Sequence, residues 1–429
     1  MKNISIKKSN GLNGEITVPG DKSITHRSVI FGALSNGTMR VKGYLTGEDN
    51  VRTIDAFRSM GVDIKESGDE LLIKGVGLNG LKKPTETIYA GNSGTTARLL
   101  LGLLAGQSFS STITGDEYLV KRPMARVTKP LSLFGANFTM NSDADVLPIT
   151  VTPGKIIPID YDMNIASAQV KSALTLAGMY ADGVNTITEP TLSRDHTENM
   201  LRAMGVSLES KDCRVTFKGG QELSAIDVTV PGDISSAAFF IVAALIIKGS
   251  SLVIKGVGVN PTRTGILDVL ISMGGDITLE NKRSLAGEDV ADIVVKHSDL
   301  KGIDIRGDVI PRAIDEFPII ALCAAMAEGT TTVRDAKELR VKESDRIATT
   351  AENLRKLGVT VTEYPDGMDI VGGASLRGAT DLKSYGDHRI AMMLSIAALA
   401  CDAESTINDI DCVNTSFPNF YALLASINK

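Results

Sequence analysis

The chain has 429 residues, of which 43% are hydrophobic and 22% are charged, the balance of a soluble globular protein. This length exceeds what one hydrophobic core usually organises, so we expect two domains. The net charge of −6 argues against binding of nucleic acid or a membrane surface through overall charge. Any site for an anion must therefore be a local cluster of Arg and Lys side chains.

The cysteines, histidines and apolar runs indicate whether to expect a metal site, a reducing compartment or a membrane segment. The 4 Cys and 4 His lack metal-ligand spacing, so we expect no metal centre. Cys323 and Cys401 lie inside apolar stretches and are predicted to be buried thiols, which suit a reducing cytoplasm. Residues 1–16 lack the apolar core of a secretory signal, and the apolar run 237–247 is too short to cross a bilayer. We therefore expect a cytoplasmic protein without membrane or nucleic-acid partners.

Stretches rich in Ala, Gly, Leu and Ser recur at intervals of roughly seventy residues, which indicates repeated copies of one supersecondary unit. Polar residues collect at the front of each stretch. If the stretches are helices, these polar groups lie at helix N-termini, where backbone N–H groups and the helix dipole favour anions. The six stretches begin near Gly20, Gly91, Ala166, Gly232, Asp315 and Gly386.

Each unit contains two kinds of helical pattern. The first is apolar on nearly all faces, as in 237–244 and 391–398, and predicts a fully buried helix. The second is amphipathic and ends in a Gly, as in 266–274 and 347–358, and this Gly is predicted to form the C-cap. A strand-like segment follows each such glycine, so the fold class is predicted to be α/β.

A coarser repeat divides the chain into halves. Val-Pro-Gly-Asp occurs at 18–21 and again at 230–233. Val-Pro-Gly is a turn that ends a strand, and we interpret its two copies as crossings between domains. The pattern predicts one domain of residues 20–230 and a discontinuous domain of residues 1–19 with 231–429, each holding three units.

The string GDKSITHR opens the first stretch. Asp21 can cap the helix, and Lys22, Ser23 and Arg27 then project from its first turns. A cation, a hydroxyl and a forked guanidinium at a positive helix end suit a phosphate or a carboxylate. A solvated basic turn is the alternative, and His26 is expected to be structural.

Three further motifs follow in chain order: GNSGTTAR from Gly91, KRPMAR from Lys121 and SAQVK from Ser167. The Gly-rich loop lets backbone amides approach an anion closely, although it lacks Walker-A spacing. Arg122 adds a guanidinium. Ser167 and Gln169 place a hydroxyl and an amide at a helix start, which suits the hydroxyls of a polyol. Simple turn chemistry, a solvated face and a plain N-cap are the respective alternatives.

Carboxylates join the cations in the C-terminal half. Asp315 and the Glu after it precede an apolar run, where they either cap a helix or supply a general base. In LRVKESDR we expect Lys342 and Arg346 to share a helix face next to Glu343, and a solvated charged face is the alternative. Arg389 opens the last apolar helix.

So many cations at equivalent points of the repeats indicate anionic ligands. We infer two anionic groups, on two substrates, with a carboxylate nearby for proton transfer. The cations concerned are Lys22, Arg27, Arg122, Lys342, Arg346 and Arg389.

Together these motifs resemble the 3-phosphoshikimate 1-carboxyvinyltransferase family, also called 5-enolpyruvylshikimate-3-phosphate (EPSP) synthases, from about Gly20 to Pro418. The resemblance implies two similar domains, each of three βαβαββ units with buried helices, an inside-out α/β barrel of the enolpyruvyl transferase type. It places the active site in the cleft between the domains. The motifs that carry it are GDKSITHR, GNSGTTAR, KRPM, SAQVK, RDHTE, NPTR, DEFP, LRVKESDR and GDHR.

The resemblance also implies a reaction. The enolpyruvyl (1-carboxyvinyl) group of phosphoenolpyruvate passes to the 5-hydroxyl of 3-phosphoshikimate, and phosphate is released. This is a step of the shikimate pathway to chorismate and the aromatic amino acids. We expect a cytoplasmic monomer that needs no metal or organic cofactor.

The same resemblance assigns residues to each substrate. Asp315 is expected to accept the proton of the attacking hydroxyl. Glu343 is expected to handle the methylene proton, with Lys22 as its competitor for that role. The expected 3-phosphoshikimate ligands are Lys22, Ser23, Arg27, Ser167, Ala168, Gln169, Arg194, Asp315 and Lys342. The expected phosphoenolpyruvate ligands are Lys22, Gly94, Arg122, Gln169, Arg346 and Arg389.

One difference from the pattern of some family members concerns inhibition by glyphosate. The string Asn-Thr-Ser-Phe-Pro at 414–418 lacks a Lys that some family members place before this motif. With SAQVK, RDHTE and NPTR it resembles the class II form, which is associated with low sensitivity to glyphosate. Glyphosate tolerance is therefore our hypothesis, although Gly94, in place of an Ala, argues against it.

Two other functions stay open at this point. UDP-N-acetylglucosamine enolpyruvyl transferase shares the fold, but it typically carries a reactive Cys in a mobile loop, for which this sequence has no obvious counterpart. A non-catalytic anion-binding module on the same scaffold is the second alternative. Asp315 and Glu343 argue against it, because simple binding of anions needs no carboxylates.

Overall fold

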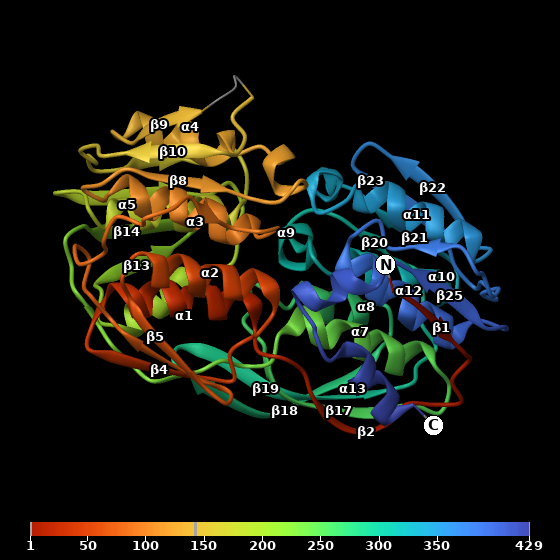
Figure 1. The fold of residues 1–429 in the computed structure, drawn as a ribbon. Helices are drawn as coiled ribbons and strands as arrows, with labels where there is room; N and C mark the ends of the chain where they lie inside the picture. Colours follow the sequence, from red (N-terminus) through yellow and green to blue (C-terminus); the bar gives the residue numbers. More distant parts are fainter. Residues whose placement is uncertain (1, 141–143, 429) are drawn as a thin grey trace. The chain divides into compact units, whose positions relative to one another are not determined.

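The computed structural model describes residues 2–140 and 144–428, which form two compact units with separate hydrophobic cores (Figure 1). The N-lobe comprises Gly20–Val230 and Ser284–Glu288. The C-lobe comprises the residues before Gly20, Pro231–Arg283 and the residues from Asp289 onward. The short segment Ser284–Glu288 departs from the predicted range 231–429, because it belongs to the N-lobe.

The N-lobe strands carry a repeated pairing pattern. Within its described residues they form four-stranded sheets in the orders β16-β4-β6-β5, β7-β8-β10-β9 and β11-β12-β14-β13, with a small sheet β15-β3. In each four-stranded sheet the first pair is parallel and the other pairs are antiparallel. The strands are β3 (Ser35–Asn36), β4 (Thr38–Lys42), β5 (Asp63–Ser67), β6 (Glu70–Lys74), β7 (Ile88–Tyr89), β8 (Ser111–Thr114), β9 (Asn137–Met140), β10 (Ile149–Thr152), β11 (Asp160–Asp162), β12 (Val184–Thr188), β13 (Leu208–Lys211), β14 (Arg214–Lys218), β15 (Leu223–Ser224) and β16 (Val228–Thr229).

Helices supply the crossovers that parallel pairs require. For example, β7 and β8 are joined through α3, and α4 then leads to the antiparallel pair β9 and β10, which makes one βαβαββ unit. The N-lobe helices are α1 (Lys22–Leu34), α2 (Glu48–Ser59), α3 (Gly94–Ala105), the 3₁₀ turn η1 (Leu119–Lys121), α4 (Ala125–Leu133), α5 (Ala168–Gly178) and α6 (His196–Ala203).

The C-lobe follows the same plan with one shorter sheet. Its described strands pair in the orders β18-β19-β17-β2, β20-β21-β23-β22 and β1-β25-β24. The strands are β1 (Asn3–Ile6), β2 (Asn13–Thr17), β17 (Ser251–Gly258), β18 (Asp276–Leu285), β19 (Glu288–Lys296), β20 (Asp304–Ile305), β21 (Thr330–Val333), β22 (Thr360–Tyr364), β23 (Gly367–Val371), β24 (Leu382–Lys383) and β25 (Ser405–Asn408). The helices are α7 (Ile234–Ile246), α8 (Gly265–Ser272), α9 (Val309–Ala313), α10 (Phe317–Met326), η2 (Lys337–Val341), α11 (Arg346–Lys356), α12 (His388–Ala400), η3 (Asp411–Thr415) and α13 (Phe420–Ile427).

The two Val-Pro-Gly-Asp copies mark an exchange of strands between the lobes. Strand β2 precedes α1 in the chain, yet it pairs in parallel with β17 of the C-lobe. Strand β16 precedes α7, yet it pairs in parallel with β4 of the N-lobe. Each copy therefore ends a strand of one lobe and opens a buried helix of the other.

The predicted apolar stretches are buried helices. α1, α3 and α5 belong to the N-lobe, and α7, α10 and α12 pack against one another in the C-lobe. In α7 every residue from Ile234 to Ile246 is buried. The predicted α/β class is thereby confirmed.

The amphipathic helices end as predicted in glycines with a left-handed backbone. Their φ angles lie between 87° and 96°, a region that disfavours any side chain with a Cβ. These glycines are Gly61, Gly135, Gly205, Gly274 and Gly358.

The contact between α3 and α5 depends on a glycine inside α3. A Cβ added to Gly102 would overlap the carbonyl oxygen of Ala173 in α5, so the backbones approach without a side chain between them. We expect Gly102→Ala to lower the free energy of unfolding by about 3 kcal/mol, because rigid backbone must move. Urea unfolding at pH 7 measures this change.

Gly32→Ala in α1 is the matched control. The atoms nearest to its added methyl belong to the side chains of Met39 and Ile73, which can shift more easily than backbone. The higher helix propensity of Ala, about 1 kcal/mol, offsets that adjustment, so we expect little net change. Equal destabilisation by the two substitutions would contradict the backbone contact.

Candidate active site

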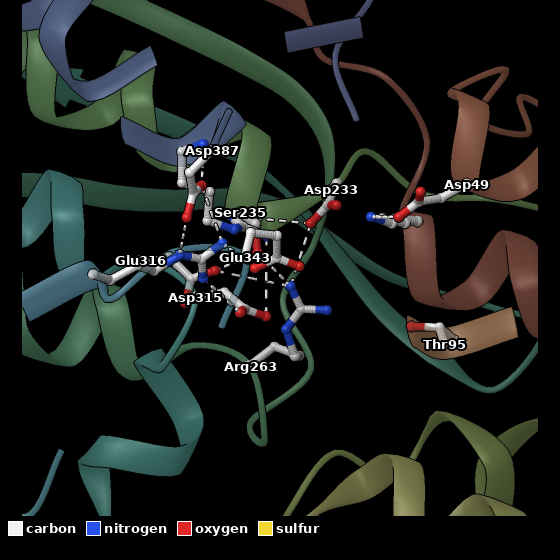
Figure 2. A network of polar contacts seen from close by, with 12 residues as sticks. Asp49, Thr95, Asp233, Ser235, Arg263, Asp315, Glu316, Glu343 and Asp387 are labelled. Carbon is white, nitrogen blue, oxygen red and sulfur yellow. Dashed lines mark hydrogen bonds and ion pairs between the residues drawn. The ribbon is translucent and has the colours of Figure 1, made fainter. Parts of the chain in front are cut away.

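The front of α1 carries Lys22 in an ion pair. Asp21 accepts a hydrogen bond from the backbone N–H of Ile24 at 2.8 Å and so caps the helix. The Lys22 ammonium pairs with the Asp49 carboxylate at the start of α2 (Figure 2). Asn50 donates to the Lys22 carbonyl at 3.0 Å, so the start of α2 holds both the backbone and the side chain of Lys22.

Arg27 is a buried, fixed cation. Its Nε donates to Thr197 Oγ1 and its Nη2 to Ser172 Oγ, both at 2.7 Å, and its Nη1 donates to the Ser23 carbonyl at 3.1 Å. Burial lowers the pKa of Arg27 to about 10, an effect that the Glu198 carboxylate partly offsets. The guanidinium therefore keeps its charge at neutral pH and ties α1 to α5 and α6.

Two guanidinium groups lie beside the first turn of α3. Arg122 Nη2 donates to Asn92 Oδ1 at 2.5 Å, and Asn92 Nδ2 donates to Asp116 at 2.8 Å. A Cβ on Gly94 would lie 2.9 Å from Arg98 Nη1 and 3.5 Å from Arg122 Nη1. Gly94 therefore lets two guanidinium groups approach this helix start, which favours an anion there.

Gln169 joins the start of α5 to the same place. Its Oε1 accepts a hydrogen bond from Arg98 Nη1 at 2.7 Å, and its Nε2 donates to Thr95 Oγ1 at 2.9 Å. Ser167 caps α5 by accepting from a backbone N–H, and Ala168 is the first residue of the helix. Arg98, which the sequence analysis did not select, therefore fixes the orientation of the Gln169 amide.

His26 has a structural position, in line with the sequence interpretation. Its Nδ1 lies 2.7 Å from Thr53 Oγ1, which in turn lies 2.7 Å from Thr96 Oγ1. Thr96 Oγ1 donates to Ser93 Oγ at 2.7 Å. This chain of hydrogen bonds links α1, α2 and α3. Burial and the neighbouring Lys22 charge hold the pKa of His26 well below its usual value.

Arg346 is the centre of a charge cluster in the C-lobe, and its carboxylate partners Asp315, Glu343 and Asp387 are labelled in Figure 2. Its side chain is 1% exposed, and its Nε donates to Asp387 Oδ2 at 2.9 Å. Its Nη2 donates to Glu343 Oε2 at 2.7 Å and its Nη1 to Asp315 Oδ1 at 3.3 Å. Burial alone would lower the pKa of Arg346, but Asp387, Glu343 and Asp315 raise it above the usual value.

Asp387 and Arg389 connect this cluster to α12. Asp387 Oδ1 accepts from the Arg389 backbone N–H at 2.9 Å and caps the helix. The Arg389 guanidinium lies 4.0 Å from Asp315. Burial would raise the pKa of Asp387, but Arg346 holds it below the usual value. Asp315 therefore lies between two guanidinium groups.

The expectation that Lys342 and Arg346 share a helix face is wrong. Lys342 follows the 3₁₀ turn η2, and α11 begins only at Arg346. Asp345 caps that helix by accepting from the Ala348 backbone N–H at 3.0 Å. The cap ends the irregular segment, which leaves Lys342 and Glu343 outside the helix.

A second buried network adjoins this cluster, and its residues were not among the predicted site residues. Arg263 Nη2 donates to Ser235 Oγ at 2.7 Å and pairs with Asp233 at 3.3 Å (Figure 2). Ser235 Oγ also donates to Glu316, the residue after Asp315. The NPTR motif could have indicated this network, because Arg263 is the arginine of that motif.

The predicted site residues divide into two groups according to the lobe that holds them, and the Arg194 charge acts on Arg27. The N-lobe group is Lys22, Ser23, Arg27, Gly94, Arg122, Ser167, Ala168, Gln169 and Arg194. The C-lobe group is Asp315, Lys342, Glu343, Arg346 and Arg389.

The described ranges contain neither a cluster of potential metal ligands nor a membrane-spanning helix. Among residues 2–140 and 144–428, His, Cys, Asp and Glu side chains do not gather in a group of three that could hold a metal ion. No helix in this part of the chain is long and apolar enough to span a membrane.

Solved structures define the class of fold. The EPSP synthase from Acinetobacter baumannii superposes with a TM-score of 0.90 at 45% identity and covers 100% of this chain and 98% of that one. The enolpyruvyl transferase NikO from Streptomyces tendae superposes with a TM-score of 0.80 at 18% identity, with coverage of 99% and 96%, and supports the fold alone. The enolpyruvyl transferase-like fold is thereby confirmed.

Sequence relatives define the family. A family model described as EPSP synthase (3-phosphoshikimate 1-carboxyvinyltransferase) matches residues 6–424. Proteins named 3-phosphoshikimate 1-carboxyvinyltransferase from Geobacter sp. (strain M21) and Pelobacter propionicus are 54% and 56% identical, covering 100% and 99% of this chain and 99% and 98% of their own lengths. The chain belongs to the EPSP synthase family, and the predicted family and transferase class are confirmed. The UDP-N-acetylglucosamine enolpyruvyl transferase alternative is not favoured.

The depressed pKa of His26 makes stability depend on pH. The unfolded chain protonates this imidazole near its ordinary pKa of about 6.5, whereas the folded chain does so only at lower pH. Stability is therefore lost as pH falls below about 6.5, by up to about 1.4 kcal/mol per pH unit. We expect His26→Gln to reduce the loss of unfolding free energy between pH 7 and pH 5, measured by urea unfolding.

Thr53→Val is the control for this experiment. It removes the hydroxyl that bonds His26 but leaves the buried imidazole, so the pH dependence should persist. An unchanged pH dependence in His26→Gln would show that other groups cause it.

Proposed function

We propose that this chain transfers the 1-carboxyvinyl group of phosphoenolpyruvate to the 5-hydroxyl of 3-phosphoshikimate and releases phosphate. The observation that carries the proposal is Asp315, a carboxylate held between the guanidinium groups of Arg346 and Arg389. Cations bind anionic substrates, and a carboxylate next to them can accept a proton. Membership of the EPSP synthase family supports the same reaction.

The N-lobe group is assigned mainly to 3-phosphoshikimate. Arg27 supplies a fixed charge, and the polar starts of α1 and α5 supply an ammonium, hydroxyls and an amide. Such groups suit a phosphate, a carboxylate and ring hydroxyls. The proposed ligands are Lys22, Ser23, Arg27, Ser167, Ala168, Gln169 and Arg194, with Asp315 and Lys342 from the C-lobe.

Phosphoenolpyruvate is assigned to both groups. The helix start at Gly94, with Arg122 beside it, supports binding of one anionic end. Arg346 and Arg389 can balance the other charges of this substrate, because guanidinium groups pair with carboxylate and phosphate through two N–H bonds. Lys22 and Gln169 complete the proposed set.

The proposed chemistry has two steps. Asp315 accepts the hydroxyl proton as the 5-oxygen bonds to C2 of phosphoenolpyruvate, and the methylene carbon gains a proton to become a methyl group. The methyl group then loses a proton, the bond from C2 to the phosphate oxygen breaks, and phosphate leaves. The cations stabilise the leaving phosphate. Glu343 and Lys22 are the two candidates for the methylene proton.

We further propose that the enzyme acts as a cytoplasmic monomer without a metal or organic cofactor. The buried free thiols of Cys323 and Cys401 suit a reducing compartment. The groups that the proposed chemistry uses all come from one chain, and none of its steps needs a Lewis acid. The net charge of −6 supports the absence of a nucleic-acid partner.

A phosphate-release assay tests the function directly. The wild-type enzyme should release phosphate only when phosphoenolpyruvate and 3-phosphoshikimate are both present. Asp315→Asn should lower kcat by about 10²- to 10⁴-fold, because a general base is lost, while binding of 3-phosphoshikimate is largely retained. Calorimetric titration measures that binding.

Asp308→Asn is the matched control, since Asp308 is exposed at the front of α9. It should keep the wild-type rate. Phosphate release with one substrate alone, or none with both, would refute the proposed reaction. Full activity of Asp315→Asn would refute the role of this carboxylate.

Glyphosate tolerance of the class II type is a separate proposal, supported by the 414–418 motif. The concentration that halves activity at fixed phosphoenolpyruvate should exceed that of a class I enzyme at least tenfold, about 1.4 kcal/mol in binding. Gly94→Ala should raise it further, and should raise the KM for phosphoenolpyruvate, because its methyl would approach Arg98 Nη1. Sensitivity near that of the class I enzyme would reject the proposal.

A further inference from the structure

The RDHTE motif and the end of SAQVK meet inside the N-lobe, and the roles proposed above leave most of their side chains unused. Thr197 of α6 and Ser172 of α5 are fully buried, and their hydroxyl oxygens lie 2.7 Å apart. Each hydroxyl also accepts a hydrogen bond from the Arg27 guanidinium at 2.7 Å. Three side chains from three helices thus form a closed triangle of hydrogen bonds.

A buried ion cluster lies next to this triangle in the chain. Lys171 Nζ is 2.6 Å from Glu189 Oε1 and 2.7 Å from Glu198 Oε1, and all three side chains are at most 1% exposed. Lys171 also donates to the Ser193 carbonyl at 3.4 Å, directly before Arg194. Burial would lower the pKa of Lys171, but Glu198 and Glu189 raise it, so the cluster is ionic. Consecutive residues of α5 therefore bind consecutive residues of α6.

The hydrogen-bonded triangle and the ion cluster together fix the orientation of the Arg27 guanidinium. A guanidinium is planar, and its N–H groups point along fixed directions, so two acceptors on different helices define its plane. The ion cluster keeps those two helices in register, because separating its partners would strand a charge in the interior. The two hydroxyl acceptors of Arg27, like the Ser23 carbonyl that also accepts from it, are neutral, so they orient the cation without cancelling its charge.

We propose that Ser172 and Thr197 are positioning residues for 3-phosphoshikimate, whose hydroxyls aim the Arg27 guanidinium at an anionic group of this substrate. The inference rests on the proposed function of Arg27 as a ligand of 3-phosphoshikimate. Neither hydroxyl touches the substrate. Both act through Arg27, so they influence substrate affinity more than the chemical step.

The experiment compares Thr197→Val with Thr175→Val in the purified full-length enzyme. Both threonines are fully buried in helices of the N-lobe, but the Thr175 hydroxyl donates to the Lys171 carbonyl at 2.9 Å, whereas the Arg27 guanidinium donates to Thr197, Ser172 and Ser23. Thr197→Val should raise the KM for 3-phosphoshikimate about tenfold, with kcat and the KM for phosphoenolpyruvate within about twofold of wild type. Thr175→Val should leave all three parameters within about twofold.

Two further comparisons distinguish positioning of Arg27 from a general structural effect of the Thr197→Val substitution. Thr197→Ser keeps the hydroxyl and should restore the KM to within about twofold of wild type, and Ser172→Ala, a smaller change, should reproduce the defect. In an Arg27→Lys background Thr197→Val should add less than about twofold, because its effect passes through the guanidinium. The same tenfold increase in both backgrounds, or equal KM values for Thr197→Val and Thr175→Val, would overturn the proposal.

Calorimetric binding of 3-phosphoshikimate alone separates this inference from the proposed function. If wild type releases no phosphate but binds 3-phosphoshikimate, and Thr197→Val weakens that binding about tenfold, the proposed reaction fails and the positioning role stands. If wild type turns over normally and Thr197→Val binds as wild type does, only the positioning role fails. If wild type does not bind 3-phosphoshikimate, both are overturned.

Discussion

Burial of whole helices is the constraint on which the site depends. The first N–H groups of an α-helix have no partner within the helix, and water cannot reach them when all sides are buried. Side-chain oxygens therefore cap these helices, and α10 instead has Pro318, which lacks an N–H, in its first turn. The same helix ends attract anions through the dipole, so capping and ligand binding compete for one place. The caps are Asp21, Ser93, Ser167, Asp233 and Asp387.

In the C-lobe one carboxylate serves both purposes, because it caps a helix and also holds a cation. Asp387 caps α12 and also holds Arg346, so the cap of a helix orients a cation that we propose as a ligand of phosphoenolpyruvate. Loss of one partner from a buried ion pair typically costs about 3–5 kcal/mol, which links the stability of this lobe to its charge cluster. An anionic substrate near Arg346 would also favour the protonated form of neighbouring carboxylates. In the proposed reaction, this effect of substrate binding would prepare Glu343 to exchange a proton.

Local signals in the sequence predicted the parts of the structure that local physics determines. The buried helices follow from composition, and glycines such as Gly358 follow from the left-handed backbone that ends a helix. Pairings across the chain were not predictable, because nothing in the spacing joins Lys171 to Glu189 or Arg263 to Ser235. The error at Lys342 arose from charge spacing alone, when the cap signal of the following Asp345 marked the true helix start.

The exchange of strands gives the two lobes different requirements for folding. The N-lobe sheet that contains β4 is completed by β16, which lies within the same continuous stretch of chain. The C-lobe needs β1 and β2 from the N-terminal segment, and Asn3 pairs with Asn408 across almost the whole sequence. Closing so long a loop is slow, because its entropy must be lost before the pairing stabilises anything. The N-lobe can therefore form first, with Gly20–Val230 as its continuous core, whereas β2 must pair with β17 and β1 with β25 near the end of the chain.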